Sequence, residues 1–201
     1  MPEVKDVRVG LPEQGVTGAI KSAPLGTALP DLTDITKAAV TLNAAFKGNE
    51  FVSEDGLTIS PSMSTTDIKD WSGANVRKIL SSFDGTLAWA MISTNEEQMK
   101  RTFGEDYVET KDATAAHGNQ TKAALGAHLP EHRSWVFLMK DGDARMVVVV
   151  PDGQVAEVGD ITFNSTGALQ WPITLATYPD ENGHNIYIMT DDGQVLTDSE
   201  S

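Results

Sequence analysis

The chain has 201 residues, a formal net charge of -14 and no cysteine, which excludes disulfides and thiolate metal sites. Its 15 lysine and arginine residues are scattered, whereas a protein that grips nucleic acid needs a clustered basic surface. No apolar run approaches the length of about 20 residues that a membrane-spanning helix needs. Residues 1–6 lack a basic head followed by an apolar core, so we expect neither membrane insertion nor a signal peptide. The acidity fits either solubility or a surface that repels phosphate.

The N-terminal part of the chain lacks strong strand patterns. Proline occurs four times in the first 30 residues, and we expect residues 1–30 to form an extended arm. Residues 35–46 carry apolar side chains at spacings close to 3.6 residues. That spacing fits either a second helix or a turn-rich loop with short helical turns.

Turn signals divide most of the remaining chain into β-strands. Asp-Gly occurs at residues 55, 84, 141, 152 and 192 and Asn-Gly at 182, and these pairs suit tight hairpin turns. The clearest hairpin joins the apolar runs 135–139 and 145–150. Pro172 cannot donate a ladder hydrogen bond, so we expect its strand to lie at a sheet edge or to carry a bulge there. Further strands are predicted at Phe51–Ser60, Trp71–Leu80, Thr86–Ile92, Asp160–Ser165, Ala168–Ala176 and Asn185–Thr190.

One short helix is predicted over residues 94–104. Thr94 is a suitable N-cap, and Glu97 three residues later completes a capping box. Acidic residues fall in the first turn and basic residues in the last, as the helix dipole favours. Met99 and Phe103 share one face. We expect this face to pack on a sheet, because so short a helix depends on packing for its stability.

Motifs that carry chemistry are missing from the sequence. It contains no nucleophile elbow, phosphate loop or calcium loop. His128 and His132 have a spacing that could present two metal ligands on a helix, but Pro130 lies between them, and a surface loop is the favoured interpretation. We therefore expect no enzymatic activity, no cofactor and no metal.

The tryptophans allow two interpretations. They could form the binding platform of a monomeric carbohydrate-binding β-sandwich module, or each could anchor the core or a subunit contact. The second interpretation is favoured. The four residues are Trp71, Trp89, Trp135 and Trp171.

Three sequence runs resemble one protein family. Residues 52–58 read VSEDGLT, residues 66–78 read TDIKDWSGANVRK, and residues 94–104 read TNEEQMKRTFG. Together with later matches such as PDGQV at residues 151–155, they resemble the major tail protein, the tail tube subunit, of long-tailed actinobacteriophages. The resemblance covers most of the chain and rests on the order of the runs.

The resemblance implies a mainly β fold, a two-sheet β-sandwich with one short flanking α-helix. Residues 1–201 would form a single tail-tube domain with the N-terminal arm and an acidic C-terminal tail at about residues 191–201. Six subunits would form a ring, and their inner sheets would join into one β-barrel around a channel. Stacked rings would form the tube of a non-contractile siphovirus tail, a virion structure built from protein made in the host cytoplasm. The type VI secretion tube shares this architecture only in general terms.

The resemblance also implies partners. These are other copies of the chain, the tape measure, tail tip and tail terminator proteins, and genomic DNA that slides through the lumen without sequence-specific binding. An acidic lumen would repel phosphates. The polar connection Ser60–Asp70 is expected to contact a neighbouring subunit or ring, although an ordinary surface loop is the other interpretation. The predicted contact residues are Pro61, Met63, Thr65, Asp67, Ile68, Asp70 and Trp71.

Overall fold

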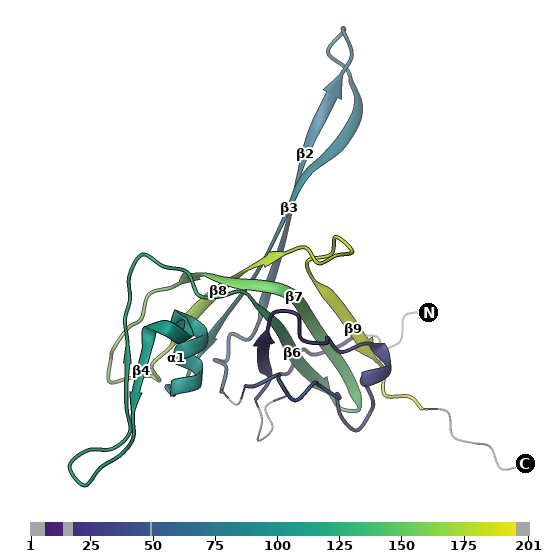
Figure 1. Cartoon of the computed structure of the whole chain (residues 1–201). Coiled ribbons are helices and arrows are strands. Elements are labelled where there is room, and N and C mark those ends of the chain that lie inside the picture. Colours follow the sequence, from purple (N-terminus) through teal and green to yellow (C-terminus); the bar gives the residue numbers. More distant parts are fainter. Residues whose placement is uncertain (1–6, 14–17, 49, 196–201) are drawn as a thin grey trace, which may run out of the picture.

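The computed structural model describes residues 7–13, 18–48 and 50–195. The described chain is mainly β, with one α-helix and two short 3-10 turns, so the predicted fold class is confirmed (Figure 1). The elements are β1 (Ile20–Pro24), η2 (Leu32–Asp34), β2 (Thr58–Lys69), β3 (Asn75–Met91), α1 (Glu96–Phe103), η3 (Glu105–Tyr107), β4 (Val108–Lys111), β5 (Gln120–Ala123), β6 (Arg133–Asp141), β7 (Ala144–Val158), β8 (Trp171–Tyr178) and β9 (Tyr187–Asp191).

Seven strands form one curled antiparallel sheet with the order β1-β6-β7-β8-β3-β2, and β9 also pairs with β7. Strand β6 lies along one edge of β7. The other edge of β7 is shared by β9, which pairs with residues 145–149, and β8, which pairs with residues 152–158. Strands β4 and β5 form a separate small sheet beside α1. The hairpin predicted around Asp141 and Gly142 is therefore confirmed as β6–β7.

The hairpin formed by β6 and β7 is buried on both faces, because a hydrophobic cluster covers each face. Trp135 and Phe137 point into the main cluster, where their ring centroids lie 5.5 and 5.2 Å from that of Trp89. Val136 and Leu138 alternate with them and point into a second cluster on the opposite face. Alternation of side chains across a strand explains why this run is apolar at every position.

Two Asp-Gly pairs that were expected to form turns lie inside strands. Trp71–Leu80 and Thr86–Ile92 were predicted as separate strands, which is wrong, because residues 75–91 form the single strand β3. Gly85 within it is needed for a close approach, since an added Cβ would lie 2.8 Å from Thr177 Oγ1. Gly153 inside β7 is needed for the same reason, since an added Cβ would lie 2.8 Å from the Leu175 side chain.

Two predictions near the C-terminal half of the sheet are also wrong. Asp160–Ser165 contains no strand, because Asn164 closes a turn by accepting hydrogen bonds from Thr166 and Gly167. The strand with Pro172 is not at an edge, since β8 lies between β7 and β3. Pro172 is the second residue of β8, and the register irregularity belongs to β7 instead.

The N-terminal region is a network of turns rather than a second helix. Residues 35–46 contain no α-helix. A capped 3-10 turn precedes them, and an isolated bridge joins Ile35 to Val40. The predicted arm is also shorter than residues 1–30, because β1 pairs with β6. Residues 1–6 and 14–17 of that arm, and residues 196–201 of the predicted acidic tail, lie outside the described residues.

Candidate functional site

The most prominent feature of the surface is the long hairpin formed by β2 and β3 (Figure 1). The two strands pair from Thr58 opposite Ala88 to Lys69 opposite Asn75. Strand β8 pairs with β3 only from Thr86 to Met91, so beyond Thr86 the hairpin leaves the sheet and continues as a two-stranded ribbon.

The ribbon has no core of its own. Every residue from 60 to 82 is exposed, including large apolar side chains. Isolated two-stranded hairpins are marginally stable in water, and clustered exposed apolar side chains mark contact surfaces. The ribbon is therefore the best candidate for a protein contact. Its exposed large apolar residues are Met63, Ile68, Trp71, Val76, Ile79 and Leu80.

All seven predicted contact residues lie on this hairpin, in β2 or at its tip. The expectation that Ser60–Asp70 is a polar connection between strands is wrong, because residues 58–69 form β2. Pro61 is tolerated since β2 is an edge strand, and it lies opposite Gly85. The serine- and threonine-rich composition concealed the strand, because no apolar face identifies it. The β-branched threonines were the available signal.

The tip of the hairpin is a tightly bonded turn. Asp70 Oδ1 accepts hydrogen bonds from Ser72 Oγ at 2.6 Å and from the Ala74 backbone N–H at 2.9 Å. The Ser72 hydrogen bond is the main reason that the pKa of Asp70 is lowered. Gly73 adopts φ +85°, a value that glycine accepts without strain. This turn presents Trp71 to solvent on a defined backbone.

The helix α1 begins one residue later than predicted. Asn95, not Thr94, is the N-cap, and its side-chain oxygen accepts from Gln98 N–H at 2.8 Å. Thr94 instead accepts a hydrogen bond from Trp171 Nε1 at 3.1 Å. The predicted capping role of Glu97 is also wrong, since its carboxylate lies 3.3 Å from Arg101 Nη2. Asn followed three residues later by Gln was the signal for the true cap.

The inner face of α1 packs as a short amphipathic helix should. Phe103 is buried in the main cluster, with its ring edge against Trp171 at a centroid distance of 5.9 Å, and Met99 packs against the same cluster. On the outer face, Lys100 Nζ lies 2.6 Å from Glu96 Oε1. This hydrogen bond raises the pKa of Lys100 and lowers that of Glu96.

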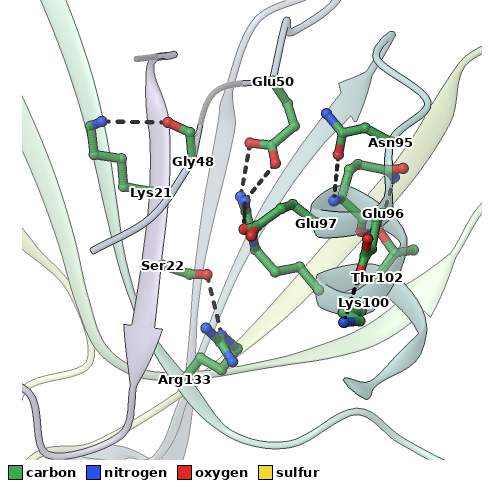
Figure 2. A network of polar contacts seen from close by, with 12 residues as sticks. Lys21, Ser22, Gly48, Glu50, Asn95, Glu96, Glu97, Lys100, Thr102 and Arg133 are labelled. Carbon is green, nitrogen blue, oxygen red and sulfur yellow. Dashed lines mark hydrogen bonds and ion pairs between the residues drawn. The ribbon is translucent and has the colours of Figure 1, made fainter. Parts of the chain in front are cut away.

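A buried ion pair ties α1 to the chain segment that precedes the hairpin. Arg101 donates from Nη1 to Glu50 Oε2 at 2.8 Å and from Nη2 to Glu50 Oε1 at 2.5 Å (Figure 2). The side chain of Glu50 is fully buried and that of Arg101 is 6% exposed. Bidentate geometry is the arrangement that best compensates the desolvation of two buried charges. Sequence reasoning missed this pair because the partners are far apart in the chain.

Basic residues on β1 and β6 extend the same network. Lys21 Nζ donates to the Gly48 carbonyl at 3.4 Å, and Arg133 Nε donates to Ser22 Oγ at 3.2 Å (Figure 2). Burial lowers the pKa of Lys21. The contacts of Lys21 with Gly48 and of Arg101 with Glu50 hold the segment before β2 against β1 and α1, so the root of the hairpin is fixed on the body.

The histidines and tryptophans have mainly structural surroundings. His128 stacks on Tyr107 with centroids 3.4 Å apart, and His132 Nδ1 lies 2.6 Å from Asp152 Oδ1, so the two do not converge on one point. Among the described residues there is no group of three or more potential metal ligands and no helix able to span a membrane. Three tryptophans are buried and only Trp71 is exposed.

The chain matches one protein family over most of its length. The phage tail tube protein family matches residues 14–197, so the chain belongs to this family. It is a structural subunit of a phage tail tube, a component of the virion tail and not an enzyme. No protein of curated function matches the chain.

Solved tail assemblies contain similar chains at low identity. A chain from the "tail of empty GTA particle computed with helical refinement, C6 symmetry" is 13% identical over 81% of this chain and 91% of its own, with a TM-score of 0.41. A chain from the anti-feeding prophage cap (AFP tube terminating cap) is 12% identical over 92% and 94%, with a TM-score of 0.46. A third, from the virion of a native gene transfer agent particle, is 11% identical over 75% and 92%, with a TM-score of 0.37.

Proposed function

We propose that the chain builds its tube as stacked hexameric rings, whose sheets join edge to edge into a continuous β-barrel around a DNA-conducting channel. The open sheet supports this proposal. Among the described residues, β2 pairs with β3 alone, and β9 pairs with β7 alone. Unpaired strand edges are sites for pairing with another chain, and joining them in a closed ring removes them.

The observation that carries the proposal is the exposed ribbon of β2 and β3. It extends beyond the sheet with apolar side chains along both strands and no covering element. We infer that the contact residues from Pro61 to Trp71 meet a neighbouring subunit or ring. Burial of this apolar surface would stabilise both the ribbon and the assembly.

The charge of the chain supports passage of DNA through the lumen. A net charge of -14 permits an acidic inner surface that repels the phosphate backbone, so that DNA slides without being held. The remaining partners follow from the assembly itself. A tube of this kind needs a tape measure protein, a tail tip that starts it and a terminator that ends it.

The sequence runs that resemble actinobacteriophage major tail proteins support a finer assignment. We infer a long, non-contractile tail of a phage that infects actinobacteria. We also infer that the whole chain is one tail-tube domain, with segments before β1 and after β9 that reach neighbouring subunits.

Negative-stain electron microscopy across a concentration series, with light scattering on the same samples, tests the assembly. We expect hollow tubes or rings with sixfold symmetry, which grow with protein concentration. Rings of another symmetry would contradict the hexamer. A monomer whose exposed Trp71 changes its fluorescence with added oligosaccharide would support the carbohydrate-binding module instead. The burial of Trp89, Trp135 and Trp171 opposes that alternative, since it removes three platform residues.

A further inference from the structure

We propose that Trp71 of one copy inserts into a groove with an apolar floor between α1, residues 125–130 and the end of β7 of a neighbouring copy. This inference rests on the proposed tube, and it identifies the site on a neighbouring copy that receives the tip of the β2–β3 hairpin. The occupant of the groove is therefore a second copy of this chain.

Trp71 is a side chain that has no partner within its own copy. Its exposure is 105%, whereas the other three tryptophans are buried. The Asp70 carboxylate is occupied within the turn, where it accepts from Ser72 and Ala74 and fixes the backbone on both sides of the indole. A large aromatic residue on a preordered turn is the kind of side chain that anchors protein interfaces, because little conformational entropy is lost on docking.

The groove has the size and lining of a site for one side chain. Its volume is about 210 Å³, below the range of roughly 300–1,000 Å³ typical of small-molecule sites. Phe103 and Val155 line its floor, while Leu125 and Leu129 lie at its rim with exposures of 68% and 59%. His128 stiffens one wall, because its Nε2 lies 3.2 Å from the Phe103 carbonyl oxygen.

Charge favours the hairpin tip as the occupant. Residues 67–78 contain three basic and two acidic side chains, in a chain whose net charge is -14. Lys69 lies two residues before Trp71, and the exposed Glu157 lines the groove. An approaching tip therefore brings positive charge to an acidic body, and Lys69 can face Glu157.

The geometry requires the contact to form between copies. The tip lies at the far end of the ribbon, since Lys69 at the end of β2 is about 26 Å from Pro61 at about 3.3 Å per residue, whereas α1 lies on the body away from the tip (Figure 1). A projection and an acceptor at separate places on one molecule make heterologous contacts, which repeat from copy to copy.

Paired cysteines test the docking directly, because the native chain has none. We would substitute Ala74→Cys at the tip together with Ala156→Cys in the groove, and treat assembled tubes with a short bis-maleimide crosslinker. Ala44→Cys, which lines a different cavity, replaces Ala156→Cys in the matched control. We expect a ladder of covalent multimers on a denaturing gel from the first pair and monomers from the control.

A second measurement follows the indole itself. Trp71 is the one exposed tryptophan, so tube formation should shift fluorescence emission to shorter wavelength, and Trp71→Phe should abolish most of that shift. Tubes that form without the Ala74–Ala156 crosslink, or that crosslink equally through Ala44, would overturn the docking and leave the tube intact. If no rings or tubes formed under any condition, the proposed assembly would fail as well.

Discussion

Removal of the Arg101 guanidinium provides the sharpest test of the packing around α1. The variant Arg101→Met keeps the length of the side chain but leaves the buried carboxylate of Glu50 without its bidentate partner. Loss of one member of a buried ion pair typically destabilises a protein by about 3–5 kcal/mol. For a chain of this size, about 1 kcal/mol corresponds to roughly 2–4 °C, so we expect Tm to fall by roughly 6–20 °C.

Thermal unfolding of the unassembled chain, followed by circular dichroism, measures the effect. Lys122→Met is the matched control, because Lys122 pairs with Glu109 while both side chains remain more than 70% exposed. Exposed pairs contribute at most about 1 kcal/mol. The double variant Glu50→Gln/Arg101→Met should recover part of the lost stability, since it also removes the buried carboxylate charge. An Arg101→Met shift no larger than that of Lys122→Met would refute the assignment of a stabilising buried pair.

Three further changes test the hairpin, the helix cap and a loop carboxylate. Ile79→Ser combined with Leu80→Ser should reduce tube formation at least severalfold in light scattering while leaving the Tm of the monomer unchanged, because both side chains are exposed; an altered Tm would indicate a fold defect instead. Asn95→Ala should destabilise the chain by about 1 kcal/mol in denaturant unfolding, whereas Asn95→Asp should retain the cap; equal losses would contradict the capping role. Asp180 has a pKa lowered to about 2, chiefly by the Tyr187 hydroxyl. Its depressed folded-state pKa means that its stabilising contribution is present above about pH 4 and is lost as pH falls through about 2. In an NMR titration, Tyr187→Phe should move this pKa toward the ordinary value, and an unchanged pKa would exclude the hydroxyl as its cause.

The sequence predicted those parts of the fold in which local pattern and tertiary contact agree. The β6–β7 hairpin is the clearest case, since apolar runs flank the Gly142 turn. Asp84-Gly85 and Asp152-Gly153 have the same local signal, yet they lie within strands. At both positions glycine is required because a neighbouring side chain occupies the space of a Cβ. No single-sequence pattern distinguishes a glycine that turns the chain from one that makes room.

The candidate site was only partly predictable. The residues from Pro61 to Trp71 were selected as a contact, but their polar character concealed a strand that has no buried face. Its exposure on both sides depends on where β8 stops pairing with β3, which is a property of the whole sheet. The groove could not have been predicted, because it brings together residues from α1, the 125–130 segment and β7 that share no local pattern.

The position of β8 has a consequence for synthesis of the chain. Among the described strands, β8 alone joins the β2–β3 hairpin to the β6–β7 part of the sheet. Thr86 can pair with Ala176 only after β8 has been synthesised. Pairing between strands far apart in the sequence forms slowly, and apolar surface stays exposed until it has formed. The hairpin is therefore translated early, but it joins the β6–β7 part of the sheet only after β8 has been synthesised. A nascent chain that stops before Trp171 contains both strands of the hairpin and lacks the strand that connects them to β7.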